Sequence, residues 1–165
     1  MCDCPHHFTE ENRSLMRKAI ALSKEKMEAG FGGPFGAIIT KDGKVIAEGY
    51  NQVTSSNDPT AHAEVTAIRN ACQALGTFDL KGCEIYTSCE PCPMCLSAIY
   101  WARLDKIYYA NSREDAAEIG FDDALLYDEI PKPIEQRSIP TERLLEDEAI
   151  EPFKDWQAKE DKVPY

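Results

Sequence analysis

One histidine and two cysteines are spaced as ligands of a metal ion. His62 stands in the stretch 60–64, and about thirty residues later Cys92 and Cys95 follow in a Cys-x-x-Cys pattern. An imidazole and two thiolates supply three ligands for a tetrahedral zinc ion and leave the fourth position for water, as in catalytic rather than structural sites. The sequence therefore predicts one catalytic Zn²⁺ in each subunit.

Glu64 follows the histidine by two positions. Residues two apart on a helix are separated by about 200° around its axis, so Glu64 and His62 should point in different directions. A carboxylate beside the metal in this way suits proton transfer better than metal ligation. We expect zinc to lower the pKa of a bound water toward about 7, and Glu64 to act first as base and then as acid.

The cysteine spacing also fits other kinds of site. Cys89, Cys92 and Cys95 have the spacing of iron–sulfur ligands, but the next ligand is normally at position 99, where this chain has isoleucine. A thioredoxin-like redox pair would leave the histidine and the glutamate without a role. A structural zinc site would need Cys89 as its fourth ligand.

Composition and charge restrict the class of partner. The chain has 165 residues, the size of one domain, and a net charge of −11 that is concentrated in residues 111–165, with 7 basic and 16 acidic groups. Such a surface repels phosphate backbones, so nucleic acid is not expected as a partner.

No apolar run approaches the roughly 20 residues that cross a bilayer, and no secretory signal is visible. With seven cysteines, an odd number, reduced thiols and a cytoplasmic location are expected.

Alternating strands and helices are expected to position the ligands. The apolar patterns predict, in chain order, a helix between Thr9 and Gly30, strands at Ala37–Thr40 and Val45–Tyr50 around an Asp42-Gly43 turn, a helix from Thr60 to Leu75, a strand at Cys83–Thr87, a helix from Cys92 to Trp101 and a strand at Lys106–Ala110. The last three elements read as a βαβ unit with parallel strands. Both ligand groups then lie at helix N-termini, where backbone N–H groups should keep both sulfurs deprotonated.

Residues 111–165 carry a weaker, acidic amphipathic pattern. Short helical pieces are expected, including one near Thr141–Glu146, and a solvated appendage is one interpretation of the segment. Phe153 and Trp156 are three residues apart and would form the anchoring face of the last helix. At the opposite end, the cysteines and histidines at positions 2, 4, 6 and 7 could bind a metal, although a frayed terminus is the simpler interpretation.

The histidine and cysteine motifs resemble those of zinc-dependent nucleobase deaminases of the cytidine deaminase superfamily. His62-Ala63-Glu64 and Pro91-Cys92-Pro93-Met94-Cys95 match the superfamily pattern without a gap. Longer strings resemble bacterial-type guanine deaminases over nearly the whole chain: Gly32-Gly33-Pro34-Phe35-Gly36, Ser56-Asn57-Asp58-Pro59-Thr60, Tyr86-Thr87-Ser88-Cys89-Glu90, Phe121-Asp122-Asp123 and the end at Tyr165.

The resemblance implies a fold and an assembly. The fold is α/β, a three-layer α-β-α sandwich around a mixed five-stranded sheet with a C-terminal helical tail. It implies one domain over residues 1–165, with a core at 9–110 and a covering segment at 111–165. The covering segment would be exchanged between the two subunits of a homodimer.

The resemblance also implies a reaction, the hydrolytic deamination of guanine to xanthine and ammonia, with a small purine base as substrate. On this interpretation Asn51 and the Ala63 backbone hold the edge of the ring, and Phe35 stacks on its face. Asp123 accepts a hydrogen bond from a ring N–H, and Tyr165 ends near the substrate. Asn51 as a turn residue and Phe35 as a core aromatic are the structural alternatives.

Two further alternatives concern acid–base chemistry and substrate. Glu142 is a weaker candidate for a second proton carrier, against the simpler interpretation of a solvated glutamate. Other deaminases of the superfamily act on guanosine, cytosine or tRNA adenosine. The last of these needs a basic groove for RNA, which the acidic balance of this chain disfavours.

Overall fold

The computed structural model describes residues 8–165, which form two compact units divided between Asp123 and Ala124. The cysteines and histidines at positions 2, 4, 6 and 7, considered above as metal ligands, lie outside the described residues. No helix among the described residues is long and apolar enough to cross a membrane.

A mixed sheet forms the centre of the first unit. Within residues 8–165 it has four strands in the order β2-β1-β3-β4: β1 (Gly36–Lys41), β2 (Lys44–Tyr50), β3 (Cys83–Cys89) and β4 (Lys106–Asn111). β1 is antiparallel to β2 and β3, whereas β3 and β4 are parallel, which confirms the βαβ prediction. The predicted hairpin is also confirmed, because Asp42 and Gly43 both have positive φ, 51° and 73°, as a type I′ turn requires.

The five-stranded sheet that the resemblance implies is wrong for the described residues. The sheet has four strands, and no fifth strand pairs with β4 at its edge. The chain turns into helix α5 (Arg113–Glu118) directly after β4. The Ser112 hydroxyl accepts from the Asp115 backbone N–H, and the Asp115 carboxylate accepts from the Ser112 backbone N–H. This capping box starts a helix at once and leaves no extended residues beside β4.

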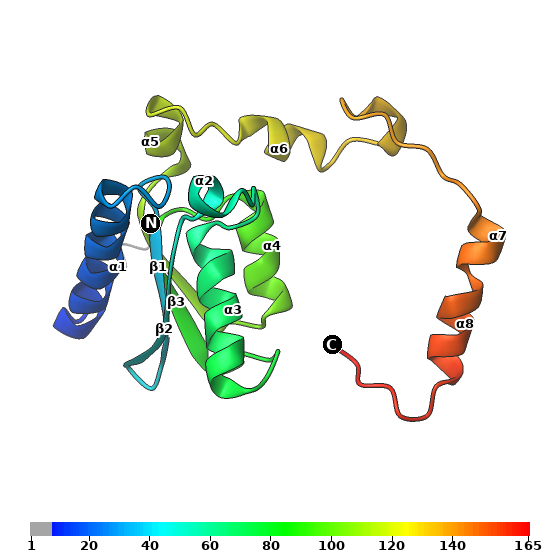
Figure 1. Cartoon of the computed structure of the whole chain (residues 1–165), viewed down its shortest axis with the longest axis horizontal. Coiled ribbons are helices and arrows are strands. Elements are labelled where there is room, and N and C mark those ends of the chain that lie inside the picture. The colour runs from blue at the N-terminus through cyan, green and yellow to red at the C-terminus, as the bar shows by residue number, and fades with distance from the viewer. Residues whose placement is uncertain (1–7) are drawn as a thin grey trace, which may run out of the picture. The chain divides into compact units, whose positions relative to one another are not determined.

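Helices cover both faces of the sheet (Figure 1). α1 (Glu10–Glu28) lies on one face, and α3 (Ala63–Leu75) and α4 (Pro93–Trp101) lie on the other. A capping box at Thr9 starts α1, which confirms the predicted cap. The loop predicted between β2 and α3 contains one short helix that the sequence analysis missed, α2 (Val53–Ser56).

The strand β1 shows how the two faces are divided. Ile38 packs with Leu15 of α1 on one face, whereas Ile39 packs with Ala67 of α3 on the other. Successive residues of a strand point to opposite faces, so both isoleucines are fully buried. The near-continuous apolar strand is therefore explained by helices on both sides.

Gly49 brings β2 and α3 into backbone contact. A Cβ atom at this position would lie 2.2 Å from the Ala63 carbonyl oxygen and 2.3 Å from the Ala67 nitrogen. Only glycine permits that approach, because the neighbouring atoms belong to the helix backbone. The first turn of α3, which carries Glu64, is thus fixed against the sheet.

The second unit consists of short helices: α6 (Ala124–Glu129), a 3₁₀ turn η1 (Ile134–Gln136), α7 (Glu146–Ala149) and α8 (Glu151–Ala158). The helix predicted near 141–146 is wrong, because residues 141–145 have no regular structure and Leu145 has a left-handed backbone, φ 56°, immediately before α7. No side chain of residues 124–165 is buried, and Phe153 is 73% exposed.

Candidate metal centre and active site

The N-terminus of α3 carries His62 and Glu64. His62 is the N-cap, with an extended backbone, and Glu64 lies in the first turn, as predicted. Thr60, the predicted cap, instead donates its hydroxyl to the Asp58 carboxylate at 2.7 Å. That hydrogen bond closes a turn before α3 begins. The helix is capped at His62, two residues later than predicted.

The N-terminus of α4 carries the two cysteines. Cys92 is the N-cap, Pro93 occupies the first helical position and Cys95 follows in the first turn. Proline is favoured there because its ring presets the helical φ and it has no N–H to leave unbonded. The prediction that a helix opens at Cys92 is confirmed.

The His62 ring nitrogen lies at the distance from each sulfur that zinc requires. The Nδ1 atom of His62 lies 3.6 Å from the Cys92 sulfur and 3.5 Å from the Cys95 sulfur. Zinc bonds of about 2.3 Å to sulfur and 2.0 Å to nitrogen, at a tetrahedral angle, separate those atoms by about 3.5 Å. All three ligand atoms lie within 4.8 Å of one another. The residues present therefore fit a zinc ion.

Contact between the two sulfurs shifts their pKa values in opposite directions. A hydrogen bond from the Cys95 side chain lowers the pKa of Cys92 to about 4, with help from the Cys95 backbone N–H and from His62. The same hydrogen bond, together with burial, raises the pKa of Cys95. Ionising both adjacent sulfurs is unfavourable because their negative charges repel, so the binding of a metal ion must release the Cys95 proton.

Glu64 is buried beside the ligand cluster, with 6% of its surface exposed. Burial is the main cause that raises the pKa of its carboxyl group, and the charge on Cys92 adds to it. The carboxyl also hydrogen-bonds with Cys95, and its Oε1 accepts from the Thr87 hydroxyl at 3.1 Å. A carboxyl group that is easily protonated and adjoins a metal site is suited to proton transfer.

Cys89 lies outside the ligand cluster. Its thiol points to the Ser112 carbonyl oxygen at 3.6 Å, and burial raises its pKa to about 11. Its sulfur is therefore directed to a backbone carbonyl and is not one of the three ligand atoms that lie within 4.8 Å of one another. This arrangement opposes both the iron–sulfur site and the structural zinc site that need Cys89.

Asn51 and Phe35 are joined through the glycine-rich turn before β1. The Asn51 side-chain oxygen accepts from the backbone N–H groups of Gly33 and Val53, both at 3.2 Å. The structural alternative for Asn51, a turn residue bonding backbone, is thus observed. Its amide nitrogen remains as the group that could donate to a ligand.

Phe35 makes an aromatic contact that sequence reasoning missed. Its ring meets Phe121 edge to face, with centroids 4.9 Å apart at 90°. A side chain at Gly33 would lie 3.1 Å from both rings, so the turn and the two aromatics pack closely. Phe121 stands in one of the strings that carried the resemblance, and this was the only signal for it.

Asp123 lies near the ligand cluster, whereas two other predicted site residues are in the second unit. Burial raises the pKa of the Asp123 carboxyl, and the negative charge of Cys92 is the next cause. Glu142 and Tyr165 are exposed residues of the second unit. Ala63 is fully buried, and its backbone N–H lies in the first turn of α3, where amides have no intrahelical acceptor.

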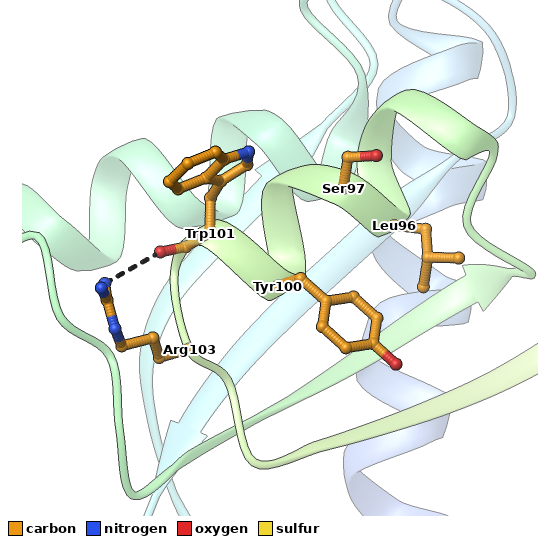
Figure 2. Close-up of a pocket in the computed structure, with 5 residues that line it drawn as sticks. All are labelled: Leu96, Ser97, Tyr100, Trp101 and Arg103. Carbon is orange, nitrogen blue, oxygen red and sulfur yellow. Dashed lines mark hydrogen bonds between the residues drawn. The ribbon is translucent and has the colours of Figure 1, made fainter. Parts of the chain in front are cut away.

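A separate hollow lies on α4, toward the end opposite Cys92 (Figure 2). It has a volume of about 490 Å³ and is lined by Leu96, Ser97, Tyr100, Trp101 and Arg103. Tyr100 is 75% exposed and Trp101 is 66% exposed. None of the ligand-cluster residues lines this hollow, so it is distinct from the candidate metal centre.

Comparison with known proteins identifies the family. Residues 9–111 match the cytidine and deoxycytidylate deaminase zinc-binding region. The chain is 54% identical, over 93% of its own length and 99% of the relative, to guanine deaminase of Bacillus subtilis. The X-ray structure of guanine deaminase from Bacillus subtilis superposes with a TM-score of 0.90 at 55% identity and covers 93% of this chain and 98% of that one.

A second kind of relative matches a shorter region. The tRNA-specific adenosine deaminase of Aquifex aeolicus is 42% identical over 58% of this chain and 63% of its own length. The match to Bacillus subtilis guanine deaminase, by contrast, extends over most of both chains. The chain therefore belongs to the cytidine and deoxycytidylate deaminase family, whose zinc-binding region it contains.

Proposed function

We propose that this protein is a zinc-dependent guanine deaminase that converts guanine and water into xanthine and ammonia. The observation that carries the proposal is the cluster of His62, Cys92 and Cys95 at zinc-binding separation beside the buried carboxyl of Glu64. The substrate is inferred from the 54% identity to guanine deaminase of Bacillus subtilis over 93% of the chain.

The chemistry divides between the metal and Glu64. A zinc ion held by the three ligands would lower the pKa of a coordinated water and so supply the nucleophile near neutral pH. Glu64 would take the first proton from that water and give it to the ring nitrogen beside carbon 2 of guanine as the water oxygen bonds to that carbon. It would then take the remaining proton from the same oxygen and give it to the amino group, which leaves as ammonia when its bond to carbon 2 breaks, so one carboxyl acts twice as base and then as acid.

Four side chains or backbone groups would recognise the base. Asn51 and the Ala63 N–H hold the ring edge, Phe35 stacks on the ring face and Asp123 accepts from a ring N–H. Two observations support placing these groups in one site. The glycine-rich turn contacts both Phe35 and Asn51, and the negative charge of Cys92 contributes to the raised pKa of Asp123. A carboxylate acceptor favours guanine because cytosine and adenine present different donors at that edge.

The substitution Asp123→Ala should reduce kcat/KM for guanine by about 10- to 100-fold, because a hydrogen bond to a charged group is lost. The zinc content should not change. Steady-state kinetics on guanine and on cytosine measure the effect, and Asp122→Ala serves as the matched neighbour. An unchanged ratio of the two substrates in the Asp123 variant would remove this residue from base selection.

A panel of guanine, guanosine, cytosine, cytidine and adenine tests the substrate assignment. The wild-type protein should release ammonia fastest from guanine, with xanthine as the second product. Faster release from a nucleoside or from a pyrimidine would refute the assignment to guanine. It would leave the metal centre and the role of Glu64 intact.

We also infer that the protein is a cytoplasmic homodimer in which residues 111–165 cover the active site of the partner subunit, with Tyr165 near the substrate. Residues 124–165 bury none of their own side chains, although Phe153 and Trp156 are large and apolar. Exposed apolar surface of this extent normally marks an interface. The free thiols at 72, 83, 89, 92 and 95 support a reducing compartment.

Co-expression of two inactive variants tests the exchange of the tail. One chain carries Glu64→Ala and an intact tail, and the other carries an intact Glu64 and lacks Tyr165. If tails are exchanged, one of the two sites in each mixed dimer is complete, so activity should return to about a quarter of the wild-type value. If each tail covers its own subunit, no site is complete and activity stays absent. Light scattering should give twice the chain mass of 18.5 kDa.

A further inference from the structure

We propose that Thr87 is a positioning residue that holds the Glu64 carboxyl group in place while that group takes up and releases protons. The inference rests on the proposed function and adds a residue that the metal motif does not contain. Thr87 lies on β3, a central strand, and is 1% exposed. A β-branched side chain on a central strand has little rotational freedom, so its hydroxyl is a fixed point.

The Thr87 hydroxyl lies between two acceptors. Its Oγ1 is 3.1 Å from Oε1 of Glu64 and 3.0 Å from the carbonyl oxygen of Cys89. A hydroxyl has one proton to donate and can also accept a hydrogen bond. The hydroxyl can therefore donate its proton to only one of these two oxygens at a time, while its own oxygen can accept a hydrogen bond from another group.

This arrangement matches the two states that the reaction requires of Glu64. When Glu64 is ionised, the Thr87 hydroxyl donates to Oε1. When Glu64 has taken the proton, its carboxyl can donate to the Thr87 oxygen, and the hydroxyl proton turns to the Cys89 carbonyl. No covalent bond changes in Thr87, and the carboxyl is held in both states.

The other partners of the carboxyl do not offer this support. Glu64 also hydrogen-bonds with the Cys95 side chain and with its own backbone amide. A zinc ion would require Cys95 as a thiolate, which has no proton to donate. The Glu64 amide lies in the same helical turn and cannot fix the far end of the side chain against the sheet. Thr87 reaches Glu64 from a separate element and ties α3 to β3.

The substitution Thr87→Val tests the inference, because it removes the hydroxyl while keeping the shape of the side chain. We expect kcat to fall by about 10- to 100-fold, the range for a lost hydrogen bond to a charged group, with KM changed by less than about twofold. Thr87→Ser restores the hydroxyl and should recover most of kcat. Zinc content should equal that of the wild type in both variants.

Thr40→Val is the matched control. Thr40 is also 1% exposed, lies on the neighbouring strand β1 and pairs with Glu84, at the end of β3 away from Thr87. The same change there should leave kcat unaltered. The inference is overturned if Thr87→Val keeps kcat within twofold, if Thr40→Val loses as much, or if Thr87→Ser fails to recover activity. All variants are compared on the base that the wild type deaminates fastest, so a different preferred base refutes only the guanine assignment.

Discussion

Replacing Glu64 with alanine should reduce turnover by roughly 10³- to 10⁴-fold, the upper range for a single acid–base group, while zinc stays bound. The carboxyl is buried beside the ligand cluster and hydrogen-bonds with Thr87, and it is outside the set of three metal ligands. Its loss removes the only group we assign to move protons. Xanthine formation and zinc content of the same preparation provide the two measurements.

Glu64→Gln separates proton transfer from packing in this test. Glutamine keeps the volume and can still accept from the Thr87 hydroxyl, but it cannot take a proton. The two variants should therefore lose similar activity. Turnover retained by the glutamine variant would mean that another group carries the proton, and zinc lost from either variant would place Glu64 among the ligands.

The substitution Cys92→Ser should remove both the metal and the activity. Cys92 has its pKa lowered to about 4 and lies 3.6 Å from the His62 nitrogen, so it is the thiolate already prepared for zinc. A serine hydroxyl stays protonated and is a poor zinc ligand. Loss of an outer-shell partner alone weakens metal binding by about 10- to 100-fold, so loss of a ligand should cost more than that.

Cys89→Ser is the control for the cysteine series. Its thiol contacts the Ser112 carbonyl and lies outside the ligand cluster. After dialysis against a chelator, this variant should retain wild-type zinc, whereas the Cys92 variant should retain less than about a tenth. Equal zinc loss from both variants would show that Cys89 belongs to the metal site and that the site is structural.

Local signals in the sequence predicted most of the first unit. The Thr9 cap, the Asp42-Gly43 turn and the helix at Cys92 depend on residues within a few positions of one another, and all are observed. The Thr60 cap was wrong because Asp58 competes for the same hydroxyl. The fifth strand was predicted only from the family resemblance. In the structure, the capping box at Ser112 starts helix α5 directly after β4.

The ligand set was also readable from sequence, because the spacing of His62, Cys92 and Cys95 is distinctive. The contacts around it were not. Thr87 and Glu64 are 23 residues apart and meet only because α3 packs on the sheet. The different protonation of the two sulfurs likewise depends on how close they lie in three dimensions. In residues 124–165 no buried side chain sets a pattern, and the helix predicted near 141–146 was misplaced there, because α7 begins only at Glu146.

X-ray absorption at the zinc edge of the intact protein tests the central claim most directly. The cluster of one imidazole and two sulfurs predicts one zinc per chain, with two sulfur neighbours at about 2.3 Å, one nitrogen neighbour at about 2.0 Å and one oxygen neighbour from water. A third sulfur neighbour, or protein that holds no zinc after careful preparation, would contradict the hydrolytic account.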